Sequence, residues 1–458
     1  MRHPTGGRAA TPWKRAPATT DTGASTPMNL ECCVPHENND LPMHSTRRCK
    51  SAAHACAGAG STVRAGRGEE VGTMPWRTGA RLWKSFACVL LGGMTWAGAV
   101  GAQQAGSRPS FAVGPVRAEA GTRASGFLEI PPREGVDHGT QIPITVIHGA
   151  RPGPVLGLIA GTHGYEYAPI VALQRLPAKI DPRTLAGTVI VVHIANLPSF
   201  LGRTIYYSPV DGKNLNRVYP GRADGTISER IAHAITQEVI ARSDFVVDLH
   251  CGDGNEALRP YTYWMTSGTP EVNEQSKQMA LAFGLDHIVI DRERTTDPEN
   301  SVYTSNTAIL RGKPSITTET GRLGSVDEAS IGLAEAGVFN LLRHFRMVPG
   351  TPNRVEHPIW IDRNVVLRSG HTGLFYAQVE PGQTVAEGTV IGTLTDFHGN
   401  VLEQVRAPFA GVVLYVVATP PVRVGEPLGM IGHVLHDEPH SPRGDAEKGP
   451  GAESGVRK

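Results

Sequence analysis

Four apolar runs of strand length constrain the fold of this 458-residue chain most strongly. They cover residues 155–160, 188–194, 245–250 and 315–319. Near-continuous apolar strands are typical of a sheet that is covered on both faces. Helical patterns lie between and after the runs, and this alternation predicts an α/β fold with a largely parallel sheet.

Three helices have recognisable start signals. Thr226 and Glu229 form a capping box that opens a helix to about residue 241. Pro270 follows Thr269 at the start of a second helix, which runs to about residue 283. A Ser325-x-x-Glu328 pattern predicts a third helix, to about residue 345.

The sequence pattern changes after residue 350. Residues 357–435 contain short β-prone stretches broken by glycines, which predicts a small all-β domain behind a catalytic domain of residues 140–348. Segments 379–392 and 406–413 resemble lipoyl and biotinyl domains, which are barrel-sandwich hybrids. No lysine occurs between Lys313 and Lys448, so neither lipoyl nor biotin can be carried. We expect this domain to pack beside the mouth of the active site or to restrict substrate size. The polar tail 436–458 is expected to be disordered.

The first hundred residues have a different character. Residues 1–73 lack the periodicity and composition of a folded core, and we expect disorder there. Residues 74–102 have a basic start, the apolar run FACVLLGGM and small residues at 99–102, which is the pattern of a signal peptide. An uncleaved anchor is the alternative, although the run is short for a membrane span. The pattern predicts an exported protein, periplasmic in a Gram-negative source. Because a signal peptide works at an N-terminus, we hypothesise that translation starts at Met74 and that residues 1–73 are a mis-assigned extension. A lead-in of residues 103–139 then joins the signal to the catalytic domain.

The net charge and the cysteine content argue against a nucleic-acid-binding protein and against a protein stabilised by internal disulfides. A formal net charge of +1 gives no reason to expect a nucleic-acid partner. Five of the six cysteines precede residue 90, so a processed chain retains Cys251 alone and can form no internal disulfide.

Metal-ligand residues lie at the ends of the predicted strands. His163 and Glu166 follow the run 155–160 and are three residues apart, which on a starting helical turn places them on one face. His250 ends the run 245–250. Two histidines and one glutamate leave a fourth position for water on a catalytic zinc. Lone histidines are more often structural, but His163, His250 and Glu319 all lie at carboxyl ends of strands, where open α/β sheets bind ligands.

Four sequence blocks carry a family resemblance. GTHGYEY at 161–167, DGKNLNRVYPG at 211–221, DLH at 248–250 and TETG at 318–321 resemble the signature blocks of the succinylglutamate desuccinylase/aspartoacylase family. That family is a branch of the zinc carboxypeptidase superfamily. The order and spacing are similar over residues 140–345. The resemblance implies a mixed, largely parallel sheet with helices on both faces, followed by a small all-β barrel-sandwich hybrid domain.

The resemblance also implies roles for individual residues. It implies one Zn²⁺ per chain, held by His163, Glu166 and His250. It implies Glu319 as the carboxylate that activates the zinc-bound water. It points to Asn216 and Arg217 as the residues that bind a substrate carboxylate. Arg203 is where the family usually keeps an arginine beside the oxyanion.

Some of these residues could instead have purely structural roles. The Asn-rich loop 214–217 could be an ordinary turn with Arg217 in solvent. Asp248 shares a strand face with His250, so it either bonds that ligand or faces water at the strand end. Cys251 and His193 receive no catalytic role.

The most specific prediction is a zinc hydrolase that cleaves the amide bond of a small N-acyl amino acid. Alternatives are a metallocarboxypeptidase or amidase acting on small peptides or peptidoglycan fragments, and an esterase of the same family. A metal-dependent binding protein without turnover is a further alternative. The complete set His163, Glu166, His250 and Glu319 speaks against that last reading.

Overall fold

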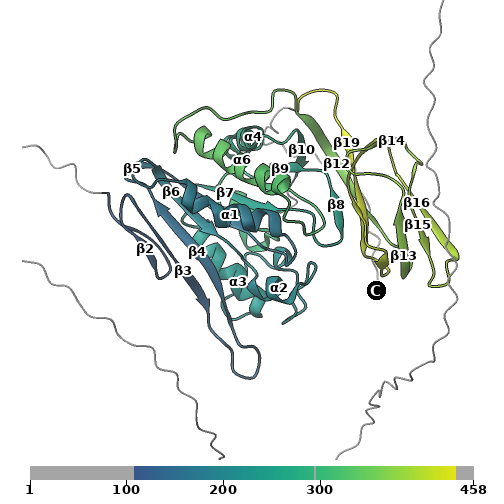
Figure 1. Ribbon diagram of the computed structural model, residues 1–458, viewed down its shortest axis with the longest axis horizontal. Helices are drawn as coiled ribbons and strands as arrows, with labels where there is room; N and C mark the ends of the chain where they lie inside the picture. Colours follow the sequence, from purple (N-terminus) through teal and green to yellow (C-terminus); the bar gives the residue numbers. More distant parts are fainter. Residues whose placement is uncertain (1–107, 293–294, 440–458) are drawn as a thin grey trace, which may run out of the picture. The chain divides into compact units, whose positions relative to one another are not determined.

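A computed structural model describes residues 108–292 and 295–439 (Figure 1). The expected signal peptide and the extension before it lie outside these residues, as does most of the tail. Within the described ranges, no helix combines the length and apolar character needed to cross a membrane.

A large mixed sheet forms the centre of the described chain. Twelve strands follow one another across it in the order β14-β17-β19-β12-β10-β9-β11-β7-β5-β6-β4-β3, and β8 pairs with β17 beside this path. Strand β3 (Thr122–Ile130) comes from the predicted lead-in. The strands of the predicted catalytic part are β4 (Thr140–His148), β5 (Arg151–Ala160), β6 (Ala186–Val192), β7 (Phe245–His250), β8 (Glu256–Leu258), β9 (Tyr261–Met265), β10 (His287–Asp291) and β11 (Ser315–Glu319). A separate hairpin is formed by β1 (Phe111–Val113) and β2 (Val116–Ala118).

The middle of the sheet is mainly parallel. Strand β5 lies parallel to β6 and β7, β7 parallel to β11, and β10 parallel to β9 and β12. Antiparallel pairs lie toward both edges and between β9 and β11. The four apolar runs of the sequence are β5, β6, β7 and β11, so the predicted α/β fold with a mixed, largely parallel sheet is confirmed.

Helices cover both faces of this sheet. On one face, α1 (Tyr167–Lys179), α4 (Pro270–Phe283) and α6 (Glu328–His344) contribute Leu173, Phe283 and Leu341 to one buried apolar cluster. On the other face, α3 (Ile227–Ile235) and the π-helical turn η2 (Thr236–Ile240) contribute to a second cluster with β1, β2 and β4. The shorter helices are α2 (Leu197–Gly202), η1 (Leu215–Arg217), η3 (Pro298–Asn300) and α5 (Thr304–Ile309).

Two of the predicted helix starts are as expected, and one is wrong. Glu229 Oε2 accepts the Thr226 backbone N–H at 2.8 Å ahead of α3, and α4 begins at Pro270. Helix α6 begins at Glu328, after the cap Asp327, and not at Ser325. Asp327 Oδ1 accepts the Ser330 N–H at 2.9 Å, while the Ser325 hydroxyl donates to Asp327 at 2.6 Å. Ser325 therefore supports the cap and does not form it.

Strands alone make up the C-terminal elements after α6, in agreement with the predicted all-β part. They are β12 (Ile359–Arg368), β13 (Gly373–Ala377), β14 (Thr384–Val385), β15 (Val390–Thr395), β16 (Val401–Arg406), β17 (Gly411–Val417), β18 (Pro421–Val422) and β19 (Pro427–Val434). A second sheet has the order β16-β15-β13-β18 and packs around a core that includes Phe375, Ile391 and Leu394.

The C-terminal strands continue the main sheet. Strand β12 lies parallel to β10, with His287 opposite Ile359. Strands β19, β17 and β14 follow β12 in that order toward the edge of the sheet. Ile361 from β12 and Val289 from β10 share one apolar cluster with Leu414 from β17. A domain boundary near residue 350 stays a prediction, and a separated catalytic part would expose the edge of β10.

Candidate metal centre

A tight turn after β5 positions the first two candidate ligands. Gly161 has a φ of 71°, which favours glycine, and it turns the chain out of the sheet. A Cβ at Gly164 would lie 2.3 Å from the Ser199 carbonyl oxygen, so only glycine fits there. Helix α1 begins at Tyr167, with Glu166 as its N-cap. His163 and Glu166 therefore lie in the turn before the helix, and the expected placement on a first helical turn is wrong.

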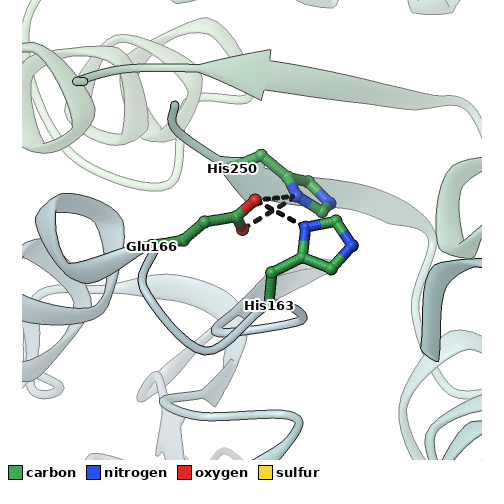
Figure 2. A group of neighbouring side chains, drawn as sticks. All are labelled: His163, Glu166 and His250. Atoms are coloured by element: carbon green, nitrogen blue, oxygen red, sulfur yellow. Dashed lines mark hydrogen bonds and ion pairs between the residues drawn. The ribbon is translucent and has the colours of Figure 1, made fainter. Parts of the chain in front are cut away.

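The structure nevertheless brings His163, Glu166 and His250 together (Figure 2). Nδ1 of His163 lies 2.7 Å from Oε1 of Glu166, and Nδ1 of His250 lies 2.9 Å from Oε2 of the same carboxylate. One ligand atom from each residue lies within 4.8 Å of the others. All three side chains are buried, with exposed fractions of 9%, 2% and 3% in the same order. The two imidazoles thus converge on one carboxylate through the same ring nitrogen.

The opposite nitrogen of each imidazole faces an oxygen acceptor. Nε2 of His163 lies 3.2 Å from Oδ1 of Asn214, and Nε2 of His250 lies 3.0 Å from Oδ2 of Asp248. Each Nε2 faces an acceptor and each Nδ1 faces Glu166, so if a cation binds at Nδ1 the remaining proton of each ring belongs on Nε2. Asp248 is fully buried, so it contacts the candidate ligand and is not a strand-end carboxylate in water.

Electrostatics at this point favour a cation. Burial opposes charge on all three groups, but their mutual attraction outweighs it. The two histidines lower the pKa of Glu166 to about 2. Asp248 and Glu166 raise the pKa of His250 well above its usual value, in spite of burial. The same attraction would act on a metal cation, and its binding would release any protons held on the Nδ1 atoms.

Zn²⁺ suits this donor set. Two imidazole nitrogens and one carboxylate oxygen are ligands that zinc takes in catalytic sites, with a fourth position left for water or substrate. The acceptors on Nε2 fix each ring in the orientation that presents Nδ1. His163, Glu166 and His250 are therefore a group that could hold one metal ion.

Glu319 lies beside the ligands on the neighbouring strand. In the parallel pair of β11 and β7, Glu319 is in register with His250. Its Oε2 is buried and has no hydrogen-bond partner among the described residues. Burial raises the pKa of this carboxyl well above its usual value; the charge of His250 opposes the rise, and the charge of Glu166 adds to it. Glu319 thus offers a carboxyl oxygen beside the candidate ligands that no other described residue binds.

Asn216 reaches the centre from the loop before α3. Its Nδ2 lies 3.4 Å from Nε2 of His250, and its Oδ1 accepts the backbone N–H of Thr304 at 3.1 Å. Thr304 is the first residue of α5, so the helix end fixes the amide. Asn216 is 8% exposed and belongs to the candidate site, whereas an ordinary turn residue would face solvent.

The two arginines are less enclosed. Arg217 is exposed, its NH1 donates to the Asn216 carbonyl at 2.7 Å, and its guanidinium carbon lies 4.7 Å from the centre of the Tyr303 ring. Arg203 is also exposed and ends α2 in a left-handed conformation with φ of 50°. Its charge opposes the rise that burial gives to the pKa of Tyr167, the residue after Glu166. Arg217 therefore lies beside Asn216, and Arg203 acts electrostatically on the residue that follows Glu166.

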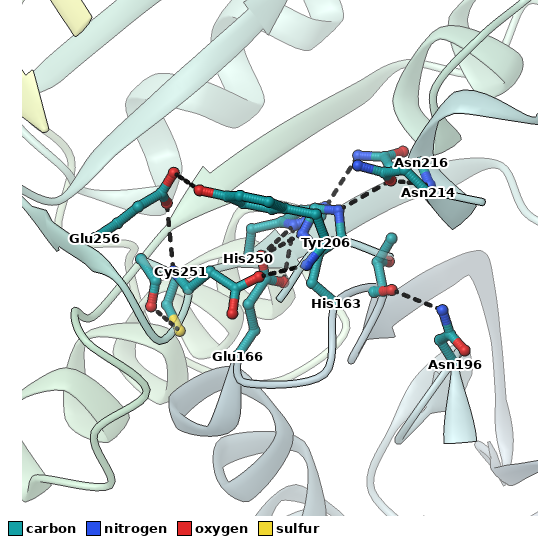
Figure 3. A network of polar contacts seen from close by, with 12 residues as sticks. His163, Glu166, Asn196, Tyr206, Asn214, Asn216, His250, Cys251 and Glu256 are labelled. Atoms are coloured by element: carbon teal, nitrogen blue, oxygen red, sulfur yellow. Dashed lines mark hydrogen bonds and ion pairs between the residues drawn. The ribbon is translucent and has the colours of Figure 1, made fainter. Parts of the chain in front are cut away.

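Sequence reasoning missed a second group of polar residues beside His163 (Figure 3). The Tyr206 hydroxyl donates to Oε1 of Glu256 at 2.6 Å, and the Tyr206 backbone N–H donates to Oδ2 of Asp253 at 3.1 Å. Burial raises the pKa of Asp253 to about 6 and the pKa of Glu256 to about 7. Asn214 was part of a matched block but had no role assigned. The only sequence signal for the group is its distance of a few residues from Arg203 or His250.

Cys251 and His193, for which no catalytic role is predicted, lie in different surroundings. Cys251 is a free, buried thiol whose pKa burial raises well above the usual value. Nε2 of His193 lies 2.8 Å from the Thr145 hydroxyl, and His193 is not among the grouped metal-ligating residues.

Comparison with known proteins identifies relatives along most of the chain. The succinylglutamate desuccinylase/aspartoacylase catalytic domain matches residues 152–345. The N-alpha-acetyl-L-2,4-diaminobutyric acid deacetylase of Halomonas elongata is 32% identical over 342 residues, which are 72% of this chain and 96% of the relative.

Solved structures are similar over the same extent. A succinylglutamate desuccinylase from Silicibacter sp. TM1040 has a TM-score of 0.62 and 26% identity, covering 71% of this chain and all of that one. The ectoine utilization protein EutE from Ruegeria pomeroyi, solved with product bound, has a TM-score of 0.61 and 27% identity. It covers 68% of this chain and 95% of that one.

Proposed function

The chain belongs to the succinylglutamate desuccinylase/aspartoacylase family, and on that basis we propose that it is a zinc-dependent deacylase that hydrolyses the amide bond of an N-acyl amino acid. The observation that carries the proposal is the convergence of His163 Nδ1, Glu166 and His250 Nδ1 on one buried point. Glu319, a buried carboxyl with no hydrogen-bond partner for Oε2 among the described residues, lies next to it.

The chain's own residues divide the chemistry between them. His163, Glu166 and His250 would hold Zn²⁺, which when bound acts as a Lewis acid and lowers the pKa of water at the open position. Glu319 takes a proton from the attacking water and gives it to the leaving amine. Burial raises the pKa of Glu319 above that of an ordinary carboxyl, which makes the ionised group a stronger base. A guanidinium from Arg203 supplies fixed positive charge where the oxyanion forms.

The substrate class follows from Asn216 and Arg217. Asn216 offers Nδ2 next to His250, while Arg217 follows it in the chain with part of its planar fork free. A guanidinium fork pairs with a carboxylate through two parallel hydrogen bonds. We therefore propose a substrate with a free carboxylate on the amino-acid side. The relative named for N-alpha-acetyl-L-2,4-diaminobutyric acid makes N-acetyl amino acids with an amino side chain the first compounds to test.

A substrate panel tests the proposal against its alternatives. It contains N-acetyl and N-succinyl amino acids, their methyl esters, and short peptides, with liberated amine as the readout. A deacylase of the proposed kind prefers the free N-acyl amino acids over the esters. Preferential release of C-terminal residues from peptides would favour a metallocarboxypeptidase. Equal amine release from acid and ester would favour a general amidase, and release of methanol from the ester would favour an esterase. Binding without turnover of any compound would favour a metal-dependent binding protein.

The proposed localisation rests on the sequence alone. We propose export, to the periplasm of a Gram-negative source, because residues 74–102 have the pattern of a signal peptide. N-terminal sequencing of protein isolated from its native cell tests this, since cleavage after residue 102 is the expected result.

A further inference from the structure

The loop between α2 and η1 folds back on itself beside the metal centre. Tyr207 and Asn214 form an antiparallel bridge, and the Ser208 N–H donates to the Lys213 carbonyl at 2.8 Å. Tyr206 therefore lies next to the residue that is paired with Asn214. Oδ1 of Asn214 in turn lies 3.2 Å from Nε2 of His163. Any displacement of Tyr206 is thus transmitted to the side chain that orients this candidate ligand.

Tyr206 also meets His163 directly. The two rings are 5.8 Å apart between centroids at an interplanar angle of 89°, so one ring presents its edge to the other (Figure 3). His163 is consequently held by two residues of the same loop, Tyr206 on the ring and Asn214 on Nε2. Neither residue occupies Nδ1, which faces Glu166.

Tyr206 needs an anchor because its backbone is in the left-handed region. Its φ is 59°, a backbone conformation that residues other than glycine adopt only when surrounding contacts impose it. Two of those contacts are hydrogen bonds, from the Tyr206 backbone N–H to Asp253 and from the Tyr206 hydroxyl to Glu256. In addition, Asn255 Oδ1 lies 3.2 Å from the same hydroxyl. The phenol bond is short, at 2.6 Å, as expected for an O–H donor on a carboxylate.

The anchor itself is attached to the C-terminal strands. Glu256 begins β8, which pairs antiparallel with β17, with Glu256 opposite Val417. Backbone bonds on either side of β8 continue this pairing, from Ala418 N–H to the Asn255 carbonyl at 2.8 Å and from Arg259 N–H to the Leu414 carbonyl at 2.9 Å. Strand β17 is a central strand of the C-terminal part, buried along its whole length.

We propose that Tyr206 is a positioning residue that couples the C-terminal strands to the metal ligand His163, through the Tyr206–Glu256 hydrogen bond. The path runs from β17 to β8, from Glu256 to the phenol, and from the Tyr206 ring and Asn214 to the imidazole. This gives the C-terminal strands a task at the metal centre beyond covering it. The inference rests on the proposed zinc site, because the measured quantity is zinc affinity.

Zinc affinity of the full-length processed chain tests the coupling. Tyr206→Phe keeps the ring and removes the anchor, and we expect zinc to bind about 10- to 100-fold more weakly, as when an outer hydrogen-bond partner of a ligand is lost. Glu256→Leu removes the acceptor and should weaken binding to a similar degree. Glu256→Gln retains an amide oxygen for the phenol and should stay within about threefold of the unmodified chain. The double variant Tyr206→Phe/Glu256→Leu should bind zinc about as weakly as Glu256→Leu alone, because the Tyr206–Glu256 hydrogen bond is already lost in that variant.

The readouts are the zinc dissociation constant, from competition with a chromogenic chelator, and the visible absorption spectrum of the Co²⁺-loaded protein. Tyr207→Phe is the matched control, since Tyr207 is 57% exposed and lies next in the chain, and it should match the unmodified chain. Circular dichroism confirms the fold, and the pair Glu256→Gln and Glu256→Leu carries the test if Tyr206→Phe does not fold.

Two contrary results have different meanings. Unchanged zinc affinity and an unchanged Co²⁺ spectrum in Tyr206→Phe would overturn the coupling, even if turnover falls, because Tyr206 would then act on the substrate alone. If the unmodified chain itself binds no zinc, the proposed function fails, and the coupling fails with it.

Discussion

Oδ2 of Asp248 lies 3.0 Å from Nε2 of His250, two residues along the same face of β7. The strand therefore supplies both a candidate ligand and the acceptor that orients it. A carboxylate at this distance favours a proton on Nε2 and raises the basicity of the ring, so it should contribute to metal affinity.

Asp248→Asn should weaken zinc binding by about 10- to 100-fold. The amide keeps the shape of the side chain and loses the charge that favours a protonated Nε2. Competition with a chelator measures the change. Asp224→Asn, in an exposed loop, is the control and should leave the affinity as it is. Full affinity in Asp248→Asn would mean that Asn216 alone orients the ring.

Glu319→Gln should keep stoichiometric zinc and lose turnover by about 10²- to 10⁴-fold. The substituted amide fills the same space at the end of β11 but cannot accept a proton from water. Metal analysis and a rate assay on one preparation separate the two properties. A variant that retains its rate would move the base to another residue, of which Glu256, a carboxyl whose pKa burial also raises, is a candidate.

Arg217→Lys should lower kcat/KM on an N-acyl amino acid by about 10- to 100-fold, because lysine keeps the charge and loses the fork. The methyl ester of the same compound has no carboxylate to bind, so its already low rate should barely change. Arg222→Lys, an exposed arginine of the same segment, controls for lost surface charge. An equal loss on acid and ester would show that Arg217 acts on the fold or the metal centre.

Stability should respond to pH through Glu256. Burial raises the pKa of this carboxyl from 4.5 to about 7, with the Tyr206 hydrogen bond opposing the rise and Asp253 adding to it. Between these values the folded state keeps a proton that the unfolded chain has released, so the stabilisation from this group is lost as pH rises through that window.

Glu256→Gln cannot titrate, so the free energy of unfolding of the unmodified chain should fall relative to this variant between about pH 4.5 and 7. Denaturant unfolding of both proteins after chelation measures the difference without zinc. Glu129→Gln, at an exposed strand position, should run parallel to the unmodified chain. A constant difference across the window would mean that Glu256 does not hold its proton in the folded state.

Strand identity and the metal set could be predicted from local sequence. The runs that became β5, β6, β7 and β11 are buried on both faces, and such strands need apolar residues at nearly every position. His163, His250 and Glu319 follow or end these runs, so their convergence follows from the rule that parallel strands end at one edge. The turn at Gly161 to Glu166 changed the local geometry of the first ligands without changing where they point.

The residues that were missed depend on contacts between distant segments. Tyr206 meets Glu256 only because β8 pairs with β17, although the two strands are far apart in the sequence. Asn214 reaches His163 through the bridge that Tyr207 makes, and no local pattern encodes that bridge. The wrong helix start at Ser325 has a different cause, because Asp327, two residues further on, caps the helix by accepting the Ser330 N–H. The merging of β12 with β10 also required long-range pairing.

Zinc titration of the metal-free chain tests the central claim most directly. Deacylation of the best N-acyl amino acid from the panel is followed as Zn²⁺ is added, with His163→Ala as a variant lacking one ligand. For a zinc-dependent deacylase the rate should start near zero, rise linearly and stop rising at one zinc per chain, with no recovery in the variant at the same concentrations. Full activity in the metal-free chain, or equal activation of His163→Ala, would contradict it.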